Sequence, residues 1–142
     1  MSLLVVDSSV IIKCYLPEVD TDKADAILAD AYSSRVELIA PEFLLLELAS
    51  ILWKHVYQVK MSRALAEAVM ADLEYAPVKY HDLRPLLAQA FDLAATHQRT
   101  VYDMLYVALA VREGCDFVTA DERLANSLAS AMPQVKKLAS WT

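Results

Sequence analysis

Residues 3–9, Leu-Leu-Val-Val-Asp-Ser-Ser, are the stretch from which the fold class can be predicted. A short, uninterrupted apolar run is typical of a strand that is buried on both faces, as in a parallel sheet. The serines that follow Asp7 can cap a helix that continues to about Tyr15 and ends before Pro17. A buried strand that leads directly into a helix indicates an α/β fold.

The rest of the chain continues this alternation of short apolar strands and helices. We expect strands at residues 36–40, 77–80, 117–119 and 135–138, and helices at residues 21–33, 41–58, 62–75, 82–97, 100–114 and 121–130. Pro41, Ser62, Asp82 and Thr100 are expected to begin helices, and Gly114 to end one. The pattern predicts one domain, residues 1–142, with a parallel sheet covered by helices on both faces.

The composition excludes several classes of protein. The chain has 142 residues, of which 57% are hydrophobic, so it can bury a sizeable core and is not disordered. Its one glycine excludes Gly-rich phosphate-binding loops. Asp7 and Lys13 interrupt the apolar N-terminus, and no run of about 18 uncharged apolar residues exists. We therefore expect neither a signal peptide nor a membrane span.

The net charge and the cysteine content restrict which partners and which cellular compartment we expect. The net charge of −6 argues against a broad basic face for duplex nucleic acid. It does not exclude a nuclease, because bound cations can neutralise an acidic cluster. Cys14 and Cys115 are far apart in sequence and form no CxxC pair, so we expect both to be buried and reduced in a cytoplasmic protein.

Four carboxylates stand in stretches that are otherwise hydrophobic. They are Asp7, Glu47, Asp103 and Asp121. A charge beside a core is costly unless it is paired or bound to a metal, and none of these stretches contains a basic residue. Two carboxylates about 4 Å apart repel by about 4 kcal/mol at an effective dielectric constant near 20, so such a pocket keeps a proton or recruits a cation. Oxygen ligands favour Mg²⁺ or Mn²⁺ over zinc.

Three of these carboxylates also have a structural explanation. The two aspartates at predicted strand ends can cap the helices that follow them. Thr100 and Asp103 have the spacing of a capping box, and so have Thr119 and Glu122. The Thr119 hydroxyl can also orient Asp121. Capping and a role in a site are compatible, because a carboxylate near a helix N-terminus can still face a cleft.

Glu47 is harder to explain as a structural residue. The side chains three and four positions away on its helix are Phe43, Leu44, Ser50 and Ile51. None of them is cationic, and the nearest candidate for a salt bridge is Lys54, one turn further along. Four basic residues near the motifs could contact phosphates, namely Lys13, Lys54, Arg99 and Arg112. Tyr102 and Tyr106 are expected in the core, with base stacking as the alternative. Trp53 is expected in the core or in a dimer interface.

Four pieces of sequence, taken in order, resemble a known family. They are Val-Val-Asp-Ser-Ser-Val at residues 5–10, residues 41–52 around Glu47, Tyr-Asp-Met-Leu-Tyr-Val-Ala-Leu-Ala at residues 102–110, and Val-Thr-Ala-Asp-Glu-Arg-Leu at residues 118–124. In order and spacing the chain resembles PIN-domain ribonucleases, and within them the small VapC-like toxins of type II toxin–antitoxin systems. One departure lies at residues 96–100, where relatives often have a glycine at a helix end.

The resemblance implies a three-layer α/β/α sandwich with a central parallel sheet and an acidic Mg²⁺ site at one end, where Mn²⁺ can substitute. It also implies hydrolysis of RNA, a homodimer and a cognate antitoxin protein. Asp7 and Asp103 match the family's most dependable metal ligands, and Glu47 and Asp121 complete the acidic set. The matching supporting hydroxyls are those of Ser9 and Thr119.

Within this hypothesis, metal ions held by Asp7, Asp103 and Asp121 activate water, and Glu47 binds a second ion or positions the water. Two other classes of function stay open. A phosphotransfer enzyme or phosphatase could use the strand-end Asp7 as a nucleophile, although a dehalogenase-type phosphatase would have a second acid where Ser9 stands. A non-catalytic protein-binding module would give no reason for four acids so placed.

Overall fold

A parallel β-sheet of five strands forms the centre of the structure, a computed structural model that describes residues 2–142. The strands are β1 (Ser2–Val6), β2 (Val36–Pro41), β3 (Val78–His81), β4 (Asp116–Thr119) and β5 (Val135–Lys137), and their order across the sheet is β3-β2-β1-β4-β5. Every neighbouring pair is parallel. The chain reverses its direction of strand addition between β1 and β4, and ligand sites of open α/β sheets form beyond the carboxyl ends of strands at such a point.

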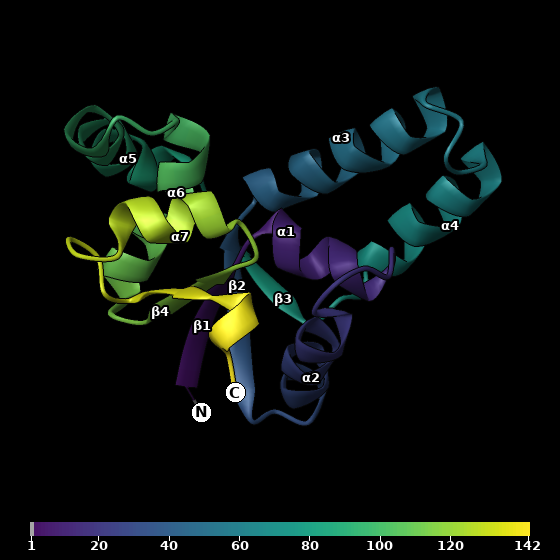
Figure 1. The fold of residues 1–142 in the computed structure, drawn as a ribbon, viewed down its shortest axis with the longest axis horizontal. Helices are drawn as coiled ribbons and strands as arrows, with labels where there is room; N and C mark the ends of the chain where they lie inside the picture. Colours follow the sequence, from purple (N-terminus) through teal and green to yellow (C-terminus); the bar gives the residue numbers. More distant parts are fainter. Residues whose placement is uncertain (1) are drawn as a thin grey trace.

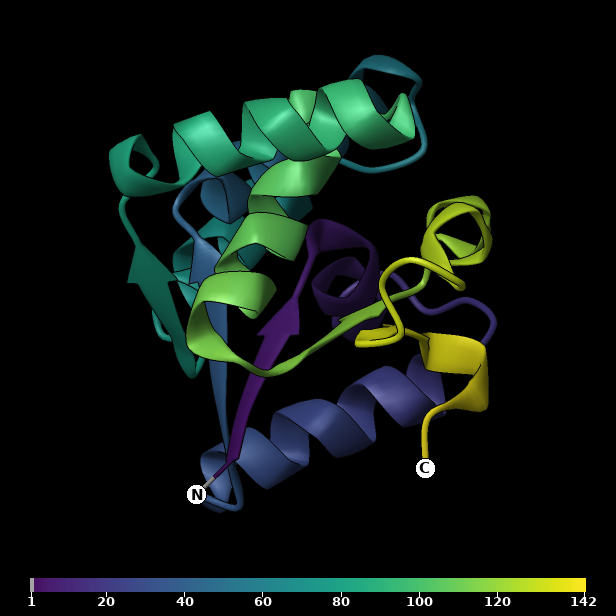
Figure 2. The ribbon, with the colours of Figure 1, turned by 90° about the vertical axis from the view of Figure 1, so that its left-hand side faces the viewer.

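Helices cover both faces of the sheet, which confirms the predicted three-layer α/β/α architecture. They are α1 (Ser8–Ile11), α2 (Thr21–Tyr32), α3 (Phe43–Tyr57), α4 (Arg63–Leu73), α5 (Arg84–His97), α6 (Val101–Glu113) and α7 (Glu122–Leu128), with short 3₁₀ turns at Ile12–Cys14 and Leu138–Ser140. Figures 1 and 2 show α5 and α6 together on one side of the sheet and α2 on the other.

The central strand and the helix that packs on it are the most buried elements. Val5 and Val6 of β1 are fully buried, and Val5 pairs with Ile39 on one side and Phe117 on the other. In α6, every residue from Met104 to Ala110 is buried, because the helix lies between the sheet and α5. This burial on all sides explains why its sequence is apolar all round. Both elements lead to candidate site residues, Asp7 and Asp103.

The long helix α3 and its partner α4 form a hairpin that projects from the sheet (Figure 1). Ser62 caps α4 by accepting a hydrogen bond from the backbone N–H of Leu65, as expected. Pro41 was expected to begin α3, but it is the last residue of β2 and pairs with His81. The backbone N–H of Glu42 still donates to the His81 carbonyl, so sheet pairing delays the helix until Phe43.

The start of α5 also differs from expectation, whereas its end at His97 was predicted. Asp82 was expected to cap α5, but the N-cap residue is Leu83, and no side-chain cap hydrogen bond forms there. At its other end α5 stops at Gln98, which adopts a left-handed conformation with φ 55° without being glycine. Gly114 ends α6 in the same conformation, as predicted. Within residues 2–142, no helix is long and apolar enough to span a bilayer.

Candidate active site

Asp7 lies at the carboxyl end of the central strand β1, where only 7% of the residue is exposed. One carboxylate oxygen accepts hydrogen bonds from the Ser9 backbone N–H (3.1 Å) and hydroxyl (2.5 Å). The other accepts from the Thr119 hydroxyl (2.6 Å). Asp7 itself is therefore the N-cap of α1, a role that the sequence left open between Asp7 and the two serines. Because both oxygens are bonded, the orientation of the carboxylate is fixed.

Thr119 and Ser9 join the ends of β1 and β4. The Ser9 hydroxyl accepts from the Ala120 backbone N–H (2.9 Å) and lies 3.3 Å from the Thr119 hydroxyl. The capping box predicted for Thr119 and Glu122 does not form, because Asp121 is the N-cap of α7. The Thr119 hydroxyl donates to Asp7 and accepts from the backbone N–H of Asp121, so it contacts the Asp121 backbone rather than its carboxylate. The two hydroxyls thus support Asp7 above all.

Burial changes the acidity of Asp7. It raises the pKa of this carboxyl group from 3.8 to about 7, and the nearby charge of Glu47 acts in the same direction. Hydrogen bonds from Ser9 and Thr119 oppose the shift but do not cancel it. The raised pKa indicates that the pocket holds too little positive charge to stabilise the ionised Asp7 carboxylate.

Glu47 enters the site from α3 and is held by a tyrosine of α6. Its carboxylate accepts a hydrogen bond from the Tyr106 hydroxyl. Burial raises the Glu47 pKa, and the charge of Asp103 raises it further, while the bonds from Tyr106 and Ser8 lower it. The alternative of a Glu47–Lys54 salt bridge is wrong for residues 2–142, in which Lys54 forms no ion pair.

Asp103 and Asp121 both lie in or before the first turn of a helix. The Asp103 backbone N–H donates to the Thr100 hydroxyl (3.1 Å), which is the predicted cap of α6. Asp121 is the N-cap of α7 and accepts from the Leu124 backbone N–H (3.1 Å). Burial is the largest cause of the raised Asp103 pKa, and the charge of Asp121 is the second largest. Asp121 is exposed, so it borders the site from the solvent side.

Electrostatic repulsion thus couples the pKa values of the predicted acids. Glu47 raises the pKa of Asp7, Asp103 raises that of Glu47, and Asp121 raises that of Asp103. In residues 2–142, however, no three acidic, histidine or cysteine side chains are close enough together to hold a metal ion as they stand. The donors are carboxylate and hydroxyl oxygens, and none of the four carboxylates forms a salt bridge within residues 2–142, although the charge of Arg99 lowers the Asp103 pKa. By that chemistry the residues fit a hard divalent cation.

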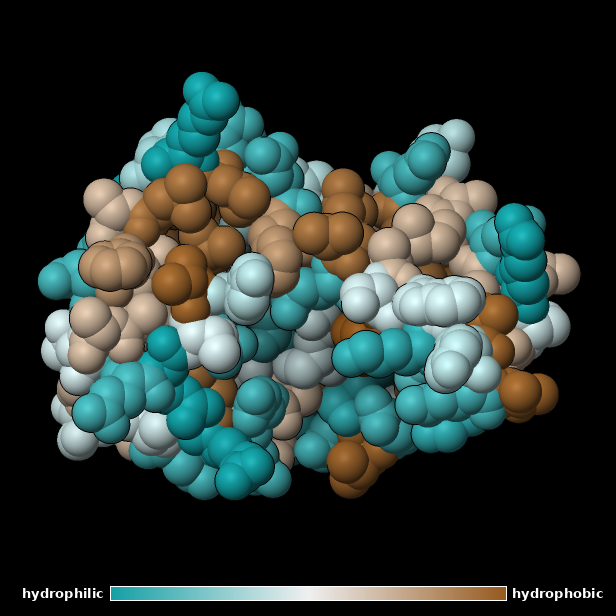
Figure 3. Space-filling model, turned by 90° about the horizontal axis from the view of Figure 1, so that it is seen from above, coloured by the Kyte–Doolittle hydropathy of each residue, from teal (hydrophilic) through white to brown (hydrophobic). Residues whose placement is uncertain are grey.

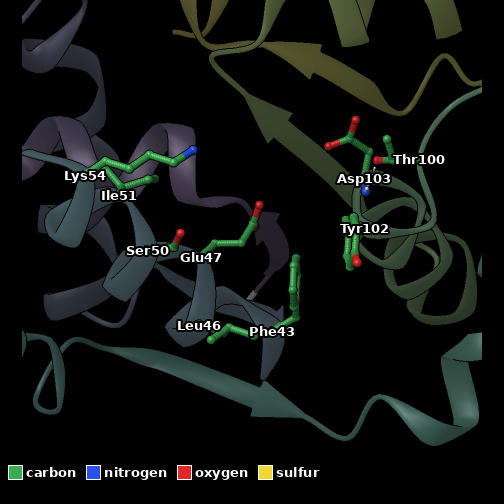
Figure 4. A pocket seen from close by; sticks show the side chains of 9 residues that line it. All are labelled: Phe43, Leu46, Glu47, Ser50, Ile51, Lys54, Thr100, Tyr102 and Asp103. Carbon is green, nitrogen blue, oxygen red and sulfur yellow. Dashed lines mark hydrogen bonds between the residues drawn. The ribbon is translucent and has the colours of Figure 1, made fainter. Parts of the chain in front are cut away.

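A cleft of about 710 Å³ separates Glu47 from Asp103. It is lined by Phe43, Leu46, Glu47, Ser50, Ile51, Lys54, Thr100, Tyr102 and Asp103. Figure 4 shows Glu47 and Lys54 extending from α3 and Asp103 facing them from α6. In Figure 3 hydrophobic side chains lie over both flanks of this side of the molecule, and the hollow between them is hydrophilic. The cleft therefore places substrate-sized space beside two of the four acids.

Two residues behave differently from expectation, and a third is partly tested. Tyr102 was expected in the core but is 60% exposed, and its ring stacks on Phe43 with centroids 5.0 Å apart. Lys13 was a candidate for phosphate contact but is buried and pairs with Glu18 (3.4 Å). Trp53, expected in the core or in a dimer interface, is 61% exposed, so it lies outside the core, and its place in an interface stays a prediction.

Tyr106 was expected in the core, and it is buried, but its role toward Glu47 was missed. The available signal was its spacing, because Tyr106 follows Asp103 by three positions and so shares its face of the helix. A tyrosine on an apolar helix face needs a partner for its hydroxyl, and an unexplained glutamate elsewhere in the chain is such a partner.

The chain is also similar to known proteins in its sequence. A family model described as PIN domain matches residues 4–127. A protein named ribonuclease VapC3, from Pyrobaculum aerophilum, is 35% identical over 124 residues, which are 86% of this chain and 92% of the relative.

Solved structures share the fold. The crystal structure of PAE2754 from Pyrobaculum aerophilum superposes with a TM-score of 0.74 at 19% identity, covering 98% of this chain and 85% of that one. A toxin–antitoxin complex from Klebsiella pneumoniae gives a TM-score of 0.67 at 12% identity, covering 95% of this chain and 97% of that one.

Proposed function

The chain belongs to the PIN-domain family, and from this premise we propose that it is a divalent-cation-dependent endoribonuclease that hydrolyses RNA phosphodiester bonds. Its relative named ribonuclease VapC3, at 35% identity over most of both chains, supports the ribonuclease activity. The observation that carries the proposal is the set of four carboxylates placed just beyond the carboxyl ends of β1 and β4 and near the N-terminal ends of α3 and α6, where their charges raise one another's pKa. A site of this kind attracts a hard cation rather than a nucleotide base.

In this proposal Asp7, Asp103 and Asp121 hold Mg²⁺, for which Mn²⁺ can substitute, and Glu47 either holds a second ion or orients water. The bound ion supplies positive charge that makes a coordinated water more acidic and stabilises the charge that develops on the phosphate. Metal binding to carboxylates releases protons, so the raised pKa of Asp7 makes occupancy increase with pH.

The chain's own residues supply orientation and a place for the proton. Ser9 and Thr119 fix both oxygens of Asp7. The Glu47 carboxylate, whose pKa is raised, accepts the proton from the attacking water. A nucleophilic role for Asp7 is not favoured, because Ser9 stands where a dehalogenase-type phosphatase would have a second acid.

We further propose that the protein is the toxin of a type II toxin–antitoxin pair and acts in the cytoplasm. The support is its likeness to VapC3 and, in fold, to a toxin–antitoxin complex. A protein partner is favoured by exposed apolar side chains along the α3–α4 hairpin, namely Leu46, Trp53, Tyr57, Leu65 and Met70. An apolar groove of about 390 Å³ lies between these two helices.

Homodimerisation and a single-domain organisation over residues 1–142 belong to the same proposal. Exposed Leu87 and Phe91 on α5 are apolar surface that a second copy could cover. Sedimentation velocity of the purified protein tests the dimer, and a monomer at micromolar concentration would count against it.

The experiment that tests the activity is cleavage of a mixed pool of structured and single-stranded RNA by purified protein, in Mg²⁺, Mn²⁺ or EDTA. The Asp103→Asn protein runs alongside, with its folding checked by circular dichroism. Cutting that requires the metal and is lost in the variant supports the nuclease. If neither metal supports cutting and calorimetry detects no binding of Mn²⁺, the proposal fails, and the acids return to their capping roles.

A further inference from the structure

The cleft beside Glu47 and Asp103 has one wall made of two stacked aromatic rings. The rings of Phe43 from α3 and Tyr102 from α6 are nearly parallel, with an interplanar angle of 15° and a centroid distance of 5.0 Å. Phe43 is partly buried and packs against the core, whereas Tyr102 is 60% exposed. Packing against the core therefore fixes the Phe43 ring, and stacking on Phe43 fixes the Tyr102 ring. Together the two rings present a rigid aromatic surface to solvent.

The other end of the cleft carries a cation. Lys54 lines it two turns along α3 from Glu47, and Figure 4 shows its amino group pointing into the same space as the Glu47 carboxylate. Among residues 2–142 no acidic side chain forms a salt bridge with Lys54, so its charge is available to a ligand. The cleft thus combines an aromatic surface, a free ammonium group and two of the proposed metal-binding acids.

We propose that this cleft is the subsite for one unpaired nucleotide of single-stranded RNA, with its base on the Phe43–Tyr102 pair and a phosphate toward Lys54. The proposal rests on the proposed ribonuclease function, because it places the nucleotide next to the phosphodiester bond to be cut. Stacking on aromatic rings together with a cation for the backbone is how proteins bind single strands without reading sequence.

Charge and shape favour a single strand over the other occupants. A duplex needs a broad basic face, and the chain carries a net charge of −6. A base inside a duplex has its faces covered by its neighbours, so it cannot stack on Tyr102. A second copy of the chain has the same net charge of −6, which opposes its approach to Glu47 and Asp103, whereas a nucleotide can share their cation.

Binding of labelled RNA tests the base contact. Fluorescein-labelled single-stranded decamers, each with one abasic position, are titrated with the protein in Ca²⁺ and followed by anisotropy, and a denaturing gel checks that the RNA stays intact. At one position, removal of the base should weaken binding to the parent protein by about 5- to 150-fold. Tyr102→Leu should weaken binding of the intact decamer to a similar degree, and the abasic position should then have no further effect.

Matched variants separate stacking from general damage. Tyr75→Leu removes an aromatic ring that is 81% exposed outside the cleft, and it should leave binding of every decamer unchanged. Phe43→Leu should reproduce the Tyr102→Leu result. Lys54→Met should lower the slope of log affinity against log salt by about 0.7, the value for one single-strand phosphate contact, whereas Lys60→Met should not.

Three results would overturn the subsite. The first is a base effect that persists unchanged in Tyr102→Leu, and the second is no base effect at any position. The third is a change of mass in sedimentation of Tyr102→Leu with RNA binding intact, which would assign the rings to an interface between copies. RNA cleavage without a base effect would overturn the subsite alone, and base-dependent binding without cleavage in any metal would overturn the nuclease alone.

Discussion

The two sides of the acidic site differ in how their carboxylates are held. On the sheet side, Asp7 is buried, and both of its oxygens accept hydrogen bonds from hydroxyl groups of Ser9 and Thr119. On the helix side, Glu47 and Asp103 are half-buried and face each other across an open cleft. Glu47 has one tyrosine partner, and the carboxylate of Asp103 borders the solvent-exposed Asp121.

This difference indicates that only half of the site is organised before a ligand binds. The sheet side is rigid because its donors come from the end of β4 and from α1, beside the buried ends of two neighbouring strands. The helix side depends on how α3 and α6 pack and on a ligand that offsets the repulsion between their acids. Asp7 is therefore already oriented to bind a cation, and binding of the cation would bring the other acidic side chains closer to it.

Removal of the rigid carboxylate should have the largest effect. We expect Asp7→Asn to lower kcat/KM for RNA cleavage by about 10³-fold or more, because metal charge stabilisation is worth several kcal/mol and each 1.36 kcal/mol is tenfold in rate. Since the change also removes a buried charge, thermal stability in EDTA should not fall. Asp92→Asn, at an exposed position of α5, is the control and should leave the rate unchanged. Equal rates for the parent and Asp7→Asn would refute the assignment.

The raised pKa of Asp7 predicts how stability depends on pH in metal-free protein. The carboxyl group has a pKa of about 7 when folded and 3.8 when unfolded, so from pH 4 to 7 the folded state keeps a proton that the unfolded state has released. The free energy of unfolding should therefore fall as pH rises through this window, by at most about 4 kcal/mol from this group. Urea unfolding in EDTA at pH 5 and pH 8 measures it.

Other carboxylates also titrate in that range, so the comparison with Asp7→Asn isolates the contribution of Asp7. In Asp7→Asn the free energy of unfolding should decrease much less as pH rises. The decrease that remains is due to Glu47 and Asp103, whose pKa values are raised as well. Mg²⁺ at pH 8 should restore stability to the parent protein by binding the folded state. Identical pH profiles for the two proteins would show that Asp7 is not desolvated in solution.

On the helix side, the Tyr106 hydroxyl is expected to matter less. Tyr106→Phe keeps the ring, which stacks on Phe117 at 5.7 Å, and removes only the donor to Glu47. Loss of a group that orients a metal ligand or base lowers activity or metal affinity by about 10- to 100-fold. Mn²⁺ binding by calorimetry and RNA cleavage should both decline. Tyr80→Phe, a half-buried tyrosine of β3, is the control and should change neither.

The contrast between the two sides also explains what could be predicted from the sequence. Asp7 is placed by local pattern, because a buried strand followed by polar residues leaves its last side chain at the carboxyl edge of the sheet. The family resemblance rested on the same local motifs, and the PIN-domain match bears it out. The start and end of α6 at Thr100 and Gly114 were predicted correctly for the same reason.

Contacts between distant elements were the ones that could not be predicted. Tyr102 and Tyr106 lie four positions apart on α6 and share a helix face, yet one is 60% exposed and the other 2%. What separates them is the position of α3, which leaves Tyr102 at the mouth of the cleft and covers Tyr106. Likewise Pro41 seemed to begin a helix because its pairing with His81 depends on β3, nearly forty residues later in the chain.

The smallest effect should come from the cap of α6, and it distinguishes a loosened site from a loosened fold. Thr100 and Ser62 cap α6 and α4 with the same geometry, each hydroxyl accepting from a backbone N–H at 3.1 Å. Thr100→Ala and Ser62→Ala should each lower the free energy of unfolding by about 1 kcal/mol. Only Thr100→Ala loosens the turn that carries Asp103, so only it should slow RNA cleavage, by about the same energy or roughly fivefold. If both variants slow cleavage equally, stability rather than the position of Asp103 limits the rate, and the helix side is no less rigid than the sheet side.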